Sequence, residues 1–308
     1  MNGESRLFAA VEAGGTKFVC ALGDESGTIH SELRFPTADP VSTLAKVRDF
    51  FRHCRGVKDL RDASAPHAIG VACFGPLMLD RQSTRYGFIG NTPKAGWSHV
   101  DIAGMLAREF SCPVGFDTDV NAAALAEHRW GAGRDAKNLV YVTVGTGIGG
   151  GVLVEGVPLH GLMHPEIGHI HPRRHPLDVN FAGVCPFHGD CLEGLASGPA
   201  ILARSGCELA NLDAAHVQWD LEADYLGQLC AQLVLTVSPQ RIILGGGVMT
   251  QQRLFPLVRQ RMLHWLGGYI ERNEIIADID RFVVPPALGV RAGVLGALSL
   301  AVDAVATP

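Results

Sequence analysis

The sequence lacks an excess of charge of either sign and has no basic cluster. Its 308 residues contain 26 Lys and Arg against 31 Asp and Glu, which gives a formal net charge of −5 at pH 7. Proteins that bind nucleic acids gather Lys and Arg on one face or along one stripe, and no such run occurs here. We therefore expect no nucleic-acid partner.

The sequence also lacks the long apolar runs that are typical of membrane proteins. No uninterrupted apolar segment reaches the roughly 18 residues that a transmembrane helix needs. The first residues, MNGESRLFAAVEAGG, lack the basic region and the long apolar stretch of a secretory signal peptide. We therefore expect a cytoplasmic protein with no membrane partner.

Low-complexity stretches, charge blocks and obvious linkers are absent as well. With 47% hydrophobic residues, the chain can bury a sizeable core, and it is long enough for two lobes. Short β-branched runs alternate with amphipathic stretches, which is typical of an α/β protein. The predicted strands cover 7–13, 17–23, 67–74, 138–145, 151–156 and 241–246, and the predicted helices cover 41–54, 99–109, 121–130, 221–237, 254–266 and 292–305.

A glycine-rich hairpin occurs twice in the sequence. FAAVEAGGTKFVCAL at 8–22 and VYVTVGTGIGGGVLV at 140–154 each predict a strand, a turn with Gly and Thr, and a second strand. Backbone N–H groups in tight glycine turns form concave sites for anions. The repeat therefore predicts a duplicated α/β domain that binds a phosphate in a cleft between the two copies.

Two other nucleotide-binding motifs do not fit these turns. GTGIGG at 145–150 matches the dinucleotide pattern G-x-G-x-x-G, but that motif requires a helix after the turn, and here the strand-like GVLVEGVPL follows. Gly15, Thr16 and Lys17 are similar to part of a P-loop, but Phe18 follows the lysine where that motif needs Ser or Thr. Neither motif is therefore assigned.

Cysteine and histidine gather in one segment of the chain. Cys185, His188 and Cys191 are spaced three residues apart, and His169 lies upstream. Two thiolates and two imidazoles predict a tetrahedral zinc site of the structural type, because four protein ligands leave no position for water or substrate. His171 and His175 are alternatives to His169. Six other cysteines are isolated and are expected to be small buried residues: Cys20, Cys54, Cys73, Cys112, Cys207 and Cys230.

Asp119 follows the strand-like stretch CPVGFDTD and precedes a predicted helix, so its carboxylate would project into a cleft. Phosphoryl transfer to a hydroxyl group needs such a carboxylate to accept the proton. An equally good explanation from the residues alone is that Asp119 caps the helix that begins near Asn121. Asp117 is a less favoured candidate for the base.

Five motifs occur in the order that is seen in the ROK family of repressors, open reading frames and kinases: EAGGTK at 12–17, DVNAA at 119–123, GTGIGG at 145–150, EIGH at 166–169 and GGGVM at 245–249. The resemblance covers about residues 7–300. It implies an actin-like (ribonuclease H-like), hexokinase-type ATPase fold with two lobes and a central cleft, and a homodimer. The small lobe would comprise 1–118 and about 290–308, and the large lobe 119–289 would hold the zinc and most nucleotide contacts.

The resemblance also implies roles for individual residues. ATP is expected with Mg²⁺, which prefers oxygen ligands from phosphates and water. Asp119 would be the catalytic base, with the zinc held by His169, Cys185, His188 and Cys191. Sugar contacts are expected at Gly75, Asn91, Thr92, Lys94, Asp119, Glu166 and His169, with Glu193 a weaker candidate and Trp97 a core residue. Nucleotide contacts are expected at Glu12, Gly14, Gly15, Thr16, Lys17, Thr146, Gly147, Pro199, Gly245, Gly246, Gly247, Val248 and Met249.

Departures from the glucokinase-type pattern resemble the fructokinase branch of the family. These are Glu12 in place of Asp, TPK at 92–94, and His188 in the middle of the zinc motif. The expected reaction is phosphorylation of D-fructose by ATP to fructose 6-phosphate. A mannokinase, a glucokinase or a broad hexokinase is an alternative. A sugar-sensing regulator is a second class, but a repressor needs a helix-turn-helix ahead of the first glycine turn, where about a dozen residues stand.

Overall fold

The computed structural model describes residues 6–53 and 66–306, so the expected helix end at Cys54 lies outside the described residues. The chain forms two compact units. The first contains the chain as far as Trp130, the segment Pro158–His164 and the chain from Val290 onward, and the second contains Gly131–Val157 and Pro165–Gly289. The helix that begins at Asp119 groups with the first unit, whereas the boundary expected from the sequence placed it in the other lobe.

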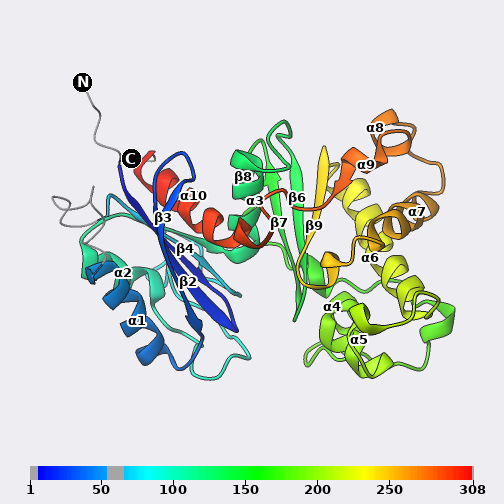
Figure 1. The fold of residues 1–308 in the computed structure, drawn as a ribbon, viewed down its shortest axis with the longest axis horizontal. Helices are drawn as coiled ribbons and strands as arrows, with labels where there is room; N and C mark the ends of the chain where they lie inside the picture. Colours follow the sequence, from blue (N-terminus) through cyan, green and yellow to red (C-terminus); the bar gives the residue numbers. More distant parts are fainter. Residues whose placement is uncertain (1–5, 54–65, 307–308) are drawn as a thin grey trace. The chain divides into compact units, whose positions relative to one another are not determined.

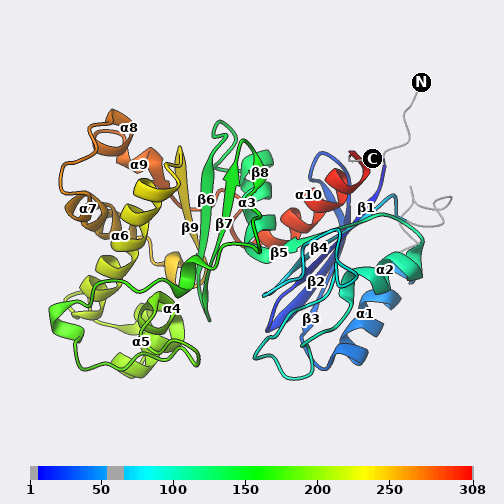
Figure 2. The same ribbon diagram turned by 180° about the vertical axis from the view of Figure 1, so that it is seen from behind.

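The first unit contains strands β1 Phe8–Ala13, β2 Lys17–Gly23, β3 Ile29–Pro36, β4 Ile69–Cys73 and β5 Val114–Thr118, and helices α1 Pro40–His53, α2 Ile102–Phe110, α3 Asp119–Trp130 and α10 Ala292–Ala306. Its sheet has the order β3-β2-β1-β4-β5 (Figures 1 and 2). β1, β2 and β3 are antiparallel neighbours, whereas β4 and β5 run parallel to β1. β4 is buried along its whole length, as expected for a strand with both faces covered.

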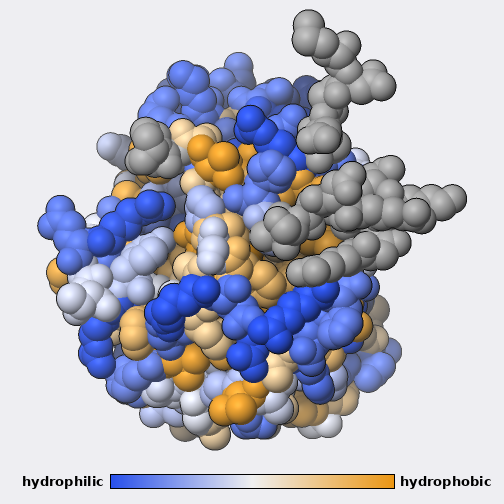
Figure 3. Space-filling view, turned by 90° about the vertical axis from the view of Figure 1, so that its left-hand side faces the viewer, coloured by the Kyte–Doolittle hydropathy of each residue, from blue (hydrophilic) through white to orange (hydrophobic). Residues whose placement is uncertain are grey.

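Helices cover both faces of this sheet. α1 and α2 share a core with sheet residues that include Phe18, and α10 packs with α3 on the opposite face (Figure 1). Trp97 is fully buried with its ring centroid 5.4 Å from that of Phe18, so the expectation of a core residue is confirmed. Seen from outside in Figure 3, this unit carries hydrophilic residues with apolar ones between them.

Glycine on the strands lets α10 lie directly on the sheet. A Cβ atom added to Gly70 in β4 would lie 1.7 Å from the carbonyl oxygen of Ala297, and one added to Gly115 in β5 would lie 2.2 Å from that of Leu300. Both distances are far below van der Waals contact, so any larger residue would displace the helix or the strand. These two positions therefore fix the height of α10 above the sheet.

The apolar composition of α10 is explained by its place in the fold. By length and mean hydropathy, the segment Gly289–Ala306 could span a membrane, although no uninterrupted apolar run was found. Half of this segment is buried inside the protein, and α10 packs against β1, β4, β5 and α3. Its apolar composition is accounted for by this packing, because a helix that is covered on most sides is apolar on most sides.

The second unit contains strands β6 Leu139–Val144, β7 Ile148–Val154, β9 Arg241–Gly245 and β10 Val283–Val284, helices α4 Leu192–Ala196, α5 Gly198–Ser205, α6 Gln218–Thr236, α7 Leu254–Leu266, α8 Asn273–Ile276 and α9 Ile279–Phe282, and 3-10 turns η2 Ile167–His169, η3 Pro176–Asp178, η4 Leu209–Asn211 and η5 Val248–Thr250. The two-residue strand β8 Val157–Pro158 pairs with the sheet of this unit, although its second residue is grouped with the first unit. This sheet has the order β10-β9-β6-β7-β8, and Figure 2 labels β9, β6, β7 and β8. α6 and α7 pack together and contribute to the core of the second unit.

The two sheets repeat one pattern. β1 and β2 form an antiparallel hairpin with the parallel strand β4 on the other side of β1, and β6 and β7 form a hairpin with the parallel strand β9 on the other side of β6. The predicted duplicated α/β fold is therefore confirmed. The strand expected at 151–156 is instead part of β7, which begins at Ile148 because the turn closes within three residues.

α2 begins later than expected, at Ile102 rather than near residue 99. Asp101 is its N-cap, and Oδ1 of Asp101 accepts a hydrogen bond of 2.9 Å from the backbone N–H of Gly104. A cap of this kind satisfies one of the free N–H groups of the first turn and so sets where the helix starts. β3, β8, β10, α4, α8 and α9 were not predicted, because short or weakly periodic elements give little sequence signal.

A carboxyl group is buried in the core of the second unit. Glu222 on α6 is completely inaccessible to solvent, and neither of its oxygens has a hydrogen-bond partner among the described residues. Burial raises the pKa of Glu222 well above its usual value of 4.5, with the Arg204 guanidinium opposing the shift. The folded protein therefore holds this carboxyl in its neutral form, whereas the unfolded chain ionises it above about pH 4.5.

Glu222→Gln is expected to change how the free energy of unfolding depends on pH. In the wild type, the unfolded state loses a proton that the folded state keeps, so stability falls as pH rises above about 4.5. The variant lacks this loss and should gain about 1.4 kcal/mol relative to wild type for each pH unit until the carboxyl ionises in the fold. Urea unfolding between pH 4 and 8 measures the difference. Exposed Glu208→Gln is the control, and parallel curves for Glu222→Gln and wild type would contradict a neutral buried carboxyl.

Candidate active site

The first glycine turn joins β1 to β2. The N–H of Gly14 donates to the carbonyl of Lys17 at 3.0 Å, and the Thr37 hydroxyl donates to the carbonyl of Gly14 at 2.7 Å. Gly15, Thr16 and Lys17 are exposed. The two hydrogen bonds of Gly14 therefore fix the base of the turn, and the exposed residues at its tip are accessible to a ligand.

Glu12 lies at the end of β1, next to this turn. A Cβ atom added to Gly293, in the first turn of α10, would lie 2.5 Å from the carboxyl carbon of Glu12, so this glycine makes room for the side chain. Burial raises the pKa of Glu12, and the Lys17 charge opposes the shift. A carboxylate at a helix N-terminus is stabilised by the helix dipole. The group is thus half-buried beside a positive helix end.

The parallel strands of the first unit end at the same level. Ala13 of β1 pairs with Cys73 of β4, and Cys73 pairs with Thr118 of β5. The glycine turn, the segment that begins at Phe74 and the residue Asp119 therefore all follow the carboxyl ends of neighbouring strands. In open α/β sheets, ligands bind at this edge.

Asp119 is the first residue of α3 and is half-buried. Its Oδ1 accepts a hydrogen bond of 2.9 Å from the N–H of Val120. The bond expected of an N-cap is made by Thr118 instead, since its hydroxyl accepts from the N–H of Asn121 at 3.1 Å. Burial, followed by the charge of Asp119, raises the pKa of Cys73 at the end of β4 well above its usual value.

Asp117 is almost completely buried, and both of its oxygens are hydrogen-bonded. Oδ1 accepts from the N–H of Thr118 at 2.7 Å and from Nδ2 of Asn121 at 2.8 Å, and Oδ2 lies 3.0 Å from Nε2 of His160. These bonds fix the corner between β5 and α3. Asp117 is thus committed to internal partners, whereas Asp119 reaches solvent.

The segment at 91–97 carries the other expected sugar contacts of the first unit. Asn91 is exposed and Lys94 is half-buried. Thr92 is only 9% exposed, its hydroxyl accepts from the N–H of Lys94 at 3.4 Å, and its N–H donates to the Ser98 hydroxyl at 3.1 Å. Nε1 of Trp97 donates to the carbonyl of Ala38 at 3.0 Å. Thr92 and Trp97 therefore shape this segment, and Asn91 and Lys94 remain accessible.

The second glycine turn, with Thr146 at its tip, joins β6 to β7. The N–H of Gly145 donates to the carbonyl of Gly147 at 2.9 Å, and the N–H of Gly198 donates to the carbonyl of Gly145 at 2.7 Å. Pro199 follows directly in the first turn of α5. The turn and the start of α5 are therefore joined by a backbone hydrogen bond.

The glycine segment after β9 lies against the end of β6, the strand that leads into the second glycine turn. Gly246 has a φ of 89°, a conformation that favours glycine. A Cβ atom on it would lie 2.3 Å from the carbonyl oxygen of Val144, at the end of β6. Of the five residues expected to contact nucleotide at 245–249, Gly245 ends β9 and the last two, Val248 and Met249, belong to η5 and are buried. Backbone therefore dominates this part of the surface.

Glycine also fixes the EIGH segment on β7. A Cβ atom on Gly168 would lie 1.8 Å from the carbonyl oxygen of Ile148, and one on Gly150 would lie 1.9 Å from Cδ1 of Ile167. η2 therefore lies flat on the strand, and Glu166 and His169 stand at its two ends. Desolvation, followed by the charge of Glu193, raises the pKa of Glu166.

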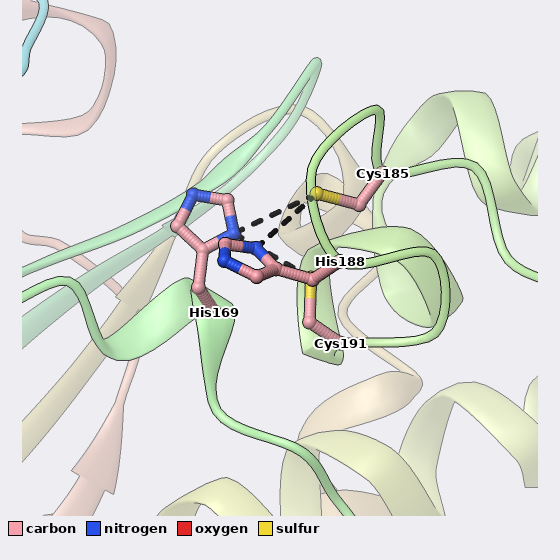
Figure 4. Close-up of side chains that lie close together, drawn as sticks. All are labelled: His169, Cys185, His188 and Cys191. Atoms are coloured by element: carbon pink, nitrogen blue, oxygen red, sulfur yellow. Dashed lines mark hydrogen bonds between the residues drawn. The ribbon is translucent and has the colours of Figure 1, made fainter.

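The four predicted metal ligands come together in the second unit (Figure 4). Their ligand atoms all lie within 4.8 Å of one another. Nδ1 of His169 lies 3.5 Å from Sγ of Cys191 and 3.8 Å from Sγ of Cys185, and Nδ1 of His188 lies 3.7 Å from Sγ of Cys185. Two nitrogen and two sulfur donors converging in this way can hold a metal ion.

The alternative ligands point to other partners. Nδ1 of His171 lies 3.6 Å from the Asp190 carboxylate, and Nδ1 of His175 accepts from the N–H of Leu177 at 3.2 Å.

Burial, with a smaller effect of the Cys185 thiol, raises the pKa of Cys191 to about 11. A buried thiol of this kind becomes a thiolate at neutral pH when a cation binds it. The donor set therefore fits a cation.

Glu193 joins the metal cluster to the second glycine turn, and its contact was not foreseen. Cys191 is the N-cap of α4, and Glu193 lies two residues later in the first turn of that helix. Its Oε2 accepts a hydrogen bond of 2.9 Å from the N–H of Ile148, directly after Gly147. The sequence signal was only its place after the last cysteine. Glu193 thus acts on the turn through one hydrogen bond and on Glu166 through its charge.

Two substitutions of Glu193 separate these effects. Glu193→Ala removes the acceptor for the Ile148 N–H, and loss of a hydrogen bond to a charged group should speed exchange of that amide by about 10- to 100-fold. Glu193→Gln keeps an acceptor oxygen and should leave the exchange rate near that of wild type. Both variants remove the charge and should lower the pKa of Glu166. Carboxyl NMR titration and hydrogen exchange measure the two effects, and equal exchange rates in the two variants would contradict the proposed hydrogen bond.

Comparisons with known proteins agree with this architecture. The ROK family description matches residues 8–304. A Bacillus subtilis relative is 46% identical over 299 residues, which cover 97% of this chain and 96% of the relative. A fructokinase from Zymomonas mobilis is 44% identical over 306 residues, 99% of each chain. The crystal structure of a ROK hexokinase from Thermus thermophilus superposes with a TM-score of 0.75 at 27% identity, covering 98% of this chain and all of that one. The chain belongs to the ROK family and has its actin-like ATPase fold.

Proposed function

We propose that the chain is an ATP-dependent fructokinase that converts D-fructose to fructose 6-phosphate and releases ADP. The observation that carries this proposal is the 44% identity to a fructokinase over 99% of both chains. Further relatives named fructokinase, from Pediococcus pentosaceus and Streptococcus mutans, are each 39% identical over most of their length. The arrangement of acidic groups and glycine turns in each unit agrees with phosphoryl transfer to a sugar hydroxyl.

Asp119 is proposed as the catalytic base. It would accept the proton of the attacking sugar hydroxyl and orient its oxygen toward the γ-phosphorus. Three observations support Asp119 over Asp117: it follows the carboxyl end of β5, it reaches solvent, and Thr118 rather than Asp119 caps α3. Its Oδ1 accepts the N–H of Val120, which holds the carboxylate at the first turn of α3.

The glycine turns are proposed to bind the phosphates of ATP. In the first unit, the amides of Gly15 and Thr16, with the charge of Lys17, would face the anionic groups, and Gly14 would close the turn through its bond to Lys17. In the second unit, Thr146, Gly147 and Pro199 lie on joined backbone segments, and 245–249 offers flat backbone for the nucleoside. Magnesium would arrive with ATP and neutralise charge that develops on its phosphates. The half-buried Glu12 carboxylate fits such a cation, directly or through water.

Sugar recognition is proposed for polar groups of both units. Glu166 and His169 stand at the ends of η2, and a carboxylate can accept hydrogen bonds from two sugar hydroxyls at once. In the first unit, Asn91 and Lys94 are accessible, and Gly75 lies after β4. Thr92 is likewise proposed to bind sugar, since a hydroxyl that accepts the Lys94 N–H can still donate its own proton.

Zinc is proposed as the ion of the Cys/His cluster, with His169, Cys185, His188 and Cys191 as ligands. Two thiolates and two imidazoles suit zinc in tetrahedral geometry, and four protein ligands close the coordination sphere. The ion would therefore be structural and would fix His169 at the end of η2. The homodimer implied by the family resemblance and the cytoplasmic location expected from the sequence stay predictions.

Asp119→Asn is expected to lower kcat for fructose phosphorylation by about 10²- to 10⁴-fold, because the amide cannot accept the proton. The amide oxygen still accepts the Val120 N–H, so the helix start is preserved. The assay couples ADP release with ATP and Mg²⁺ and compares fructose, mannose, glucose and N-acetylated hexosamines. Fructose should give the highest kcat/KM with the wild type.

Asp101→Asn is the matched control, because Asp101 is also an aspartate at a helix start of the first unit and asparagine caps equally well. Its kcat should equal that of wild type. A larger loss of kcat in Asp117→Asn than in Asp119→Asn would reverse the assignment of the base. A different preferred sugar would favour the mannokinase, glucokinase or hexokinase alternatives, and sugar binding without turnover would favour a sensor.

Cys191→Ser tests the zinc proposal. The wild type should contain about one zinc ion per chain, and the variant should lose it, since a serine hydroxyl is a poor zinc ligand. Metal analysis of the purified proteins measures this, and thermal unfolding should show a lower Tm for the variant. Cys207→Ser, at a half-buried thiol outside the cluster, is the control. Equal zinc contents in Cys191→Ser and wild type would rule out Cys191 as a ligand.

A further inference from the structure

The segment Pro158–His164 has an unusual place in the chain. It belongs to the first unit, although the chain on both sides of it belongs to the second. Its apolar side chains are exposed and its histidine is buried: Leu162 is 104% exposed and Met163 48%, whereas His164 is only 5% exposed. Hydrophobic burial would favour the opposite arrangement. The inward position of the histidine therefore depends on polar contacts.

His164 contacts the segment that follows β4. Its Nε2 accepts a hydrogen bond of 3.2 Å from the N–H of Leu77. A Cβ atom added to Gly75 would lie 3.4 Å from Cε1 and 3.6 Å from Nε2 of the ring, so the imidazole lies directly against this glycine. Leu77 is itself only 4% exposed, so its N–H has little access to water. Without the imidazole acceptor, this N–H would be left unpaired at a cost.

His160 contacts the corner between β5 and α3. Its Nε2 lies 3.0 Å from Oδ2 of Asp117, whose other oxygen accepts from Thr118 and Asn121 within the corner. The hydrogen bond to Asp117 raises the pKa of His160, with burial and Arg81 opposing the shift. His160 thus supplies a donor from outside the corner to a nearly buried carboxylate.

The two histidines therefore act on the two segments that follow β4 and β5. The proposed base Asp119 lies two residues after Asp117 on the corner that His160 contacts. The expected sugar contact Gly75 lies against the ring of His164. Loss of either contact would leave the strands in place but would release the segment beyond them, and small misplacements of reacting groups cost large factors in rate.

We infer that His160 and His164 are positioning residues for the phosphoryl transfer: His164 holds the segment at 75–77, and His160 holds the corner that carries Asp119. This inference rests on the proposed kinase function. Neither imidazole needs to touch the substrate. The two roles differ in what they affect, since a sugar contact lowers KM and an oriented base raises kcat.

Leucine and glutamine substitutions test each histidine. His164→Leu fills the space but removes the acceptor, and it should raise KM for fructose by about 10-fold while KM for ATP changes less than about twofold. His160→Leu removes the donor to Asp117 and should lower kcat by about 10- to 100-fold. Glutamine can place an amide oxygen or N–H near the position of Nε2. His164→Gln and His160→Gln should therefore recover most of each loss.

His30→Leu is the matched control, because Nε2 of His30 lies 2.9 Å from Asp24 in a similar pair at the opposite end of the sheet. Its kinetics should equal those of wild type. Unchanged kcat and KM in His160→Leu and His164→Leu would overturn the inference. If His160→Leu does not fold, the test rests on His160→Gln, which can keep the hydrogen bond to Asp117. A kcat of His160→Gln as low as that of Asp119→Asn would show that this hydrogen bond is not what the reaction depends on.

Hydrogen exchange at Leu77 separates this inference from the proposed function. The amide should exchange about 10- to 100-fold faster in His164→Leu than in wild type, and His164→Gln should restore the protection. This measurement needs no turnover. A wild type that phosphorylates no hexose would end the kinase proposal, whereas unchanged protection of Leu77 in His164→Leu would end the positioning role of His164 in an active enzyme.

Discussion

Close approach of backbone to backbone at glycine is the constraint on which the rest of the structure depends. In the first unit, Gly70 and Gly115 let α10 rest on β4 and β5, and this brings the start of α10 beside Glu12. In the second unit, Gly168 lets η2 rest on β7, which places Glu166 and His169 at fixed points along the strand. Both contacts work at distances where a single Cβ atom does not fit. The side chains of Glu12, Glu166 and His169 are thus positioned by tightly packed backbone.

The second unit adds a chain of short contacts from the metal cluster to the glycine turn. Cys191 precedes α4, Glu193 in that helix accepts the Ile148 N–H, and Gly198 after the helix donates to Gly145. Because metal binding couples to folding of its own ligands, an ion at Cys191 would stabilise the start of α4 as well. The turn would then gain rigidity from an ion with which it has no contact.

The sequence was most informative where chemistry needs fixed residue types. The glycine hairpins, the ligand spacing at 185–191 and the aspartate after β5 could all be identified, and the structure brings His169 to the two cysteines as expected. Contacts that depend on packing could not be identified. Nothing in the sequence distinguishes His164 from the other histidines, because its role comes from the N–H of Leu77, 87 residues away. Thr118 likewise could not be separated from Asp119 as the helix cap.

Neither unit is one continuous piece of chain. The first unit takes its last helix, α10, from the end of the sequence, after the whole of the second unit. During synthesis, the face of the sheet formed by β1, β4 and β5 therefore lacks α10 until the second unit has been made. Since the backbone groove at Gly70 and Gly115 accepts only a closely fitting helix, the first unit exposes an apolar surface during synthesis, which chaperones would have to cover until α10 has emerged.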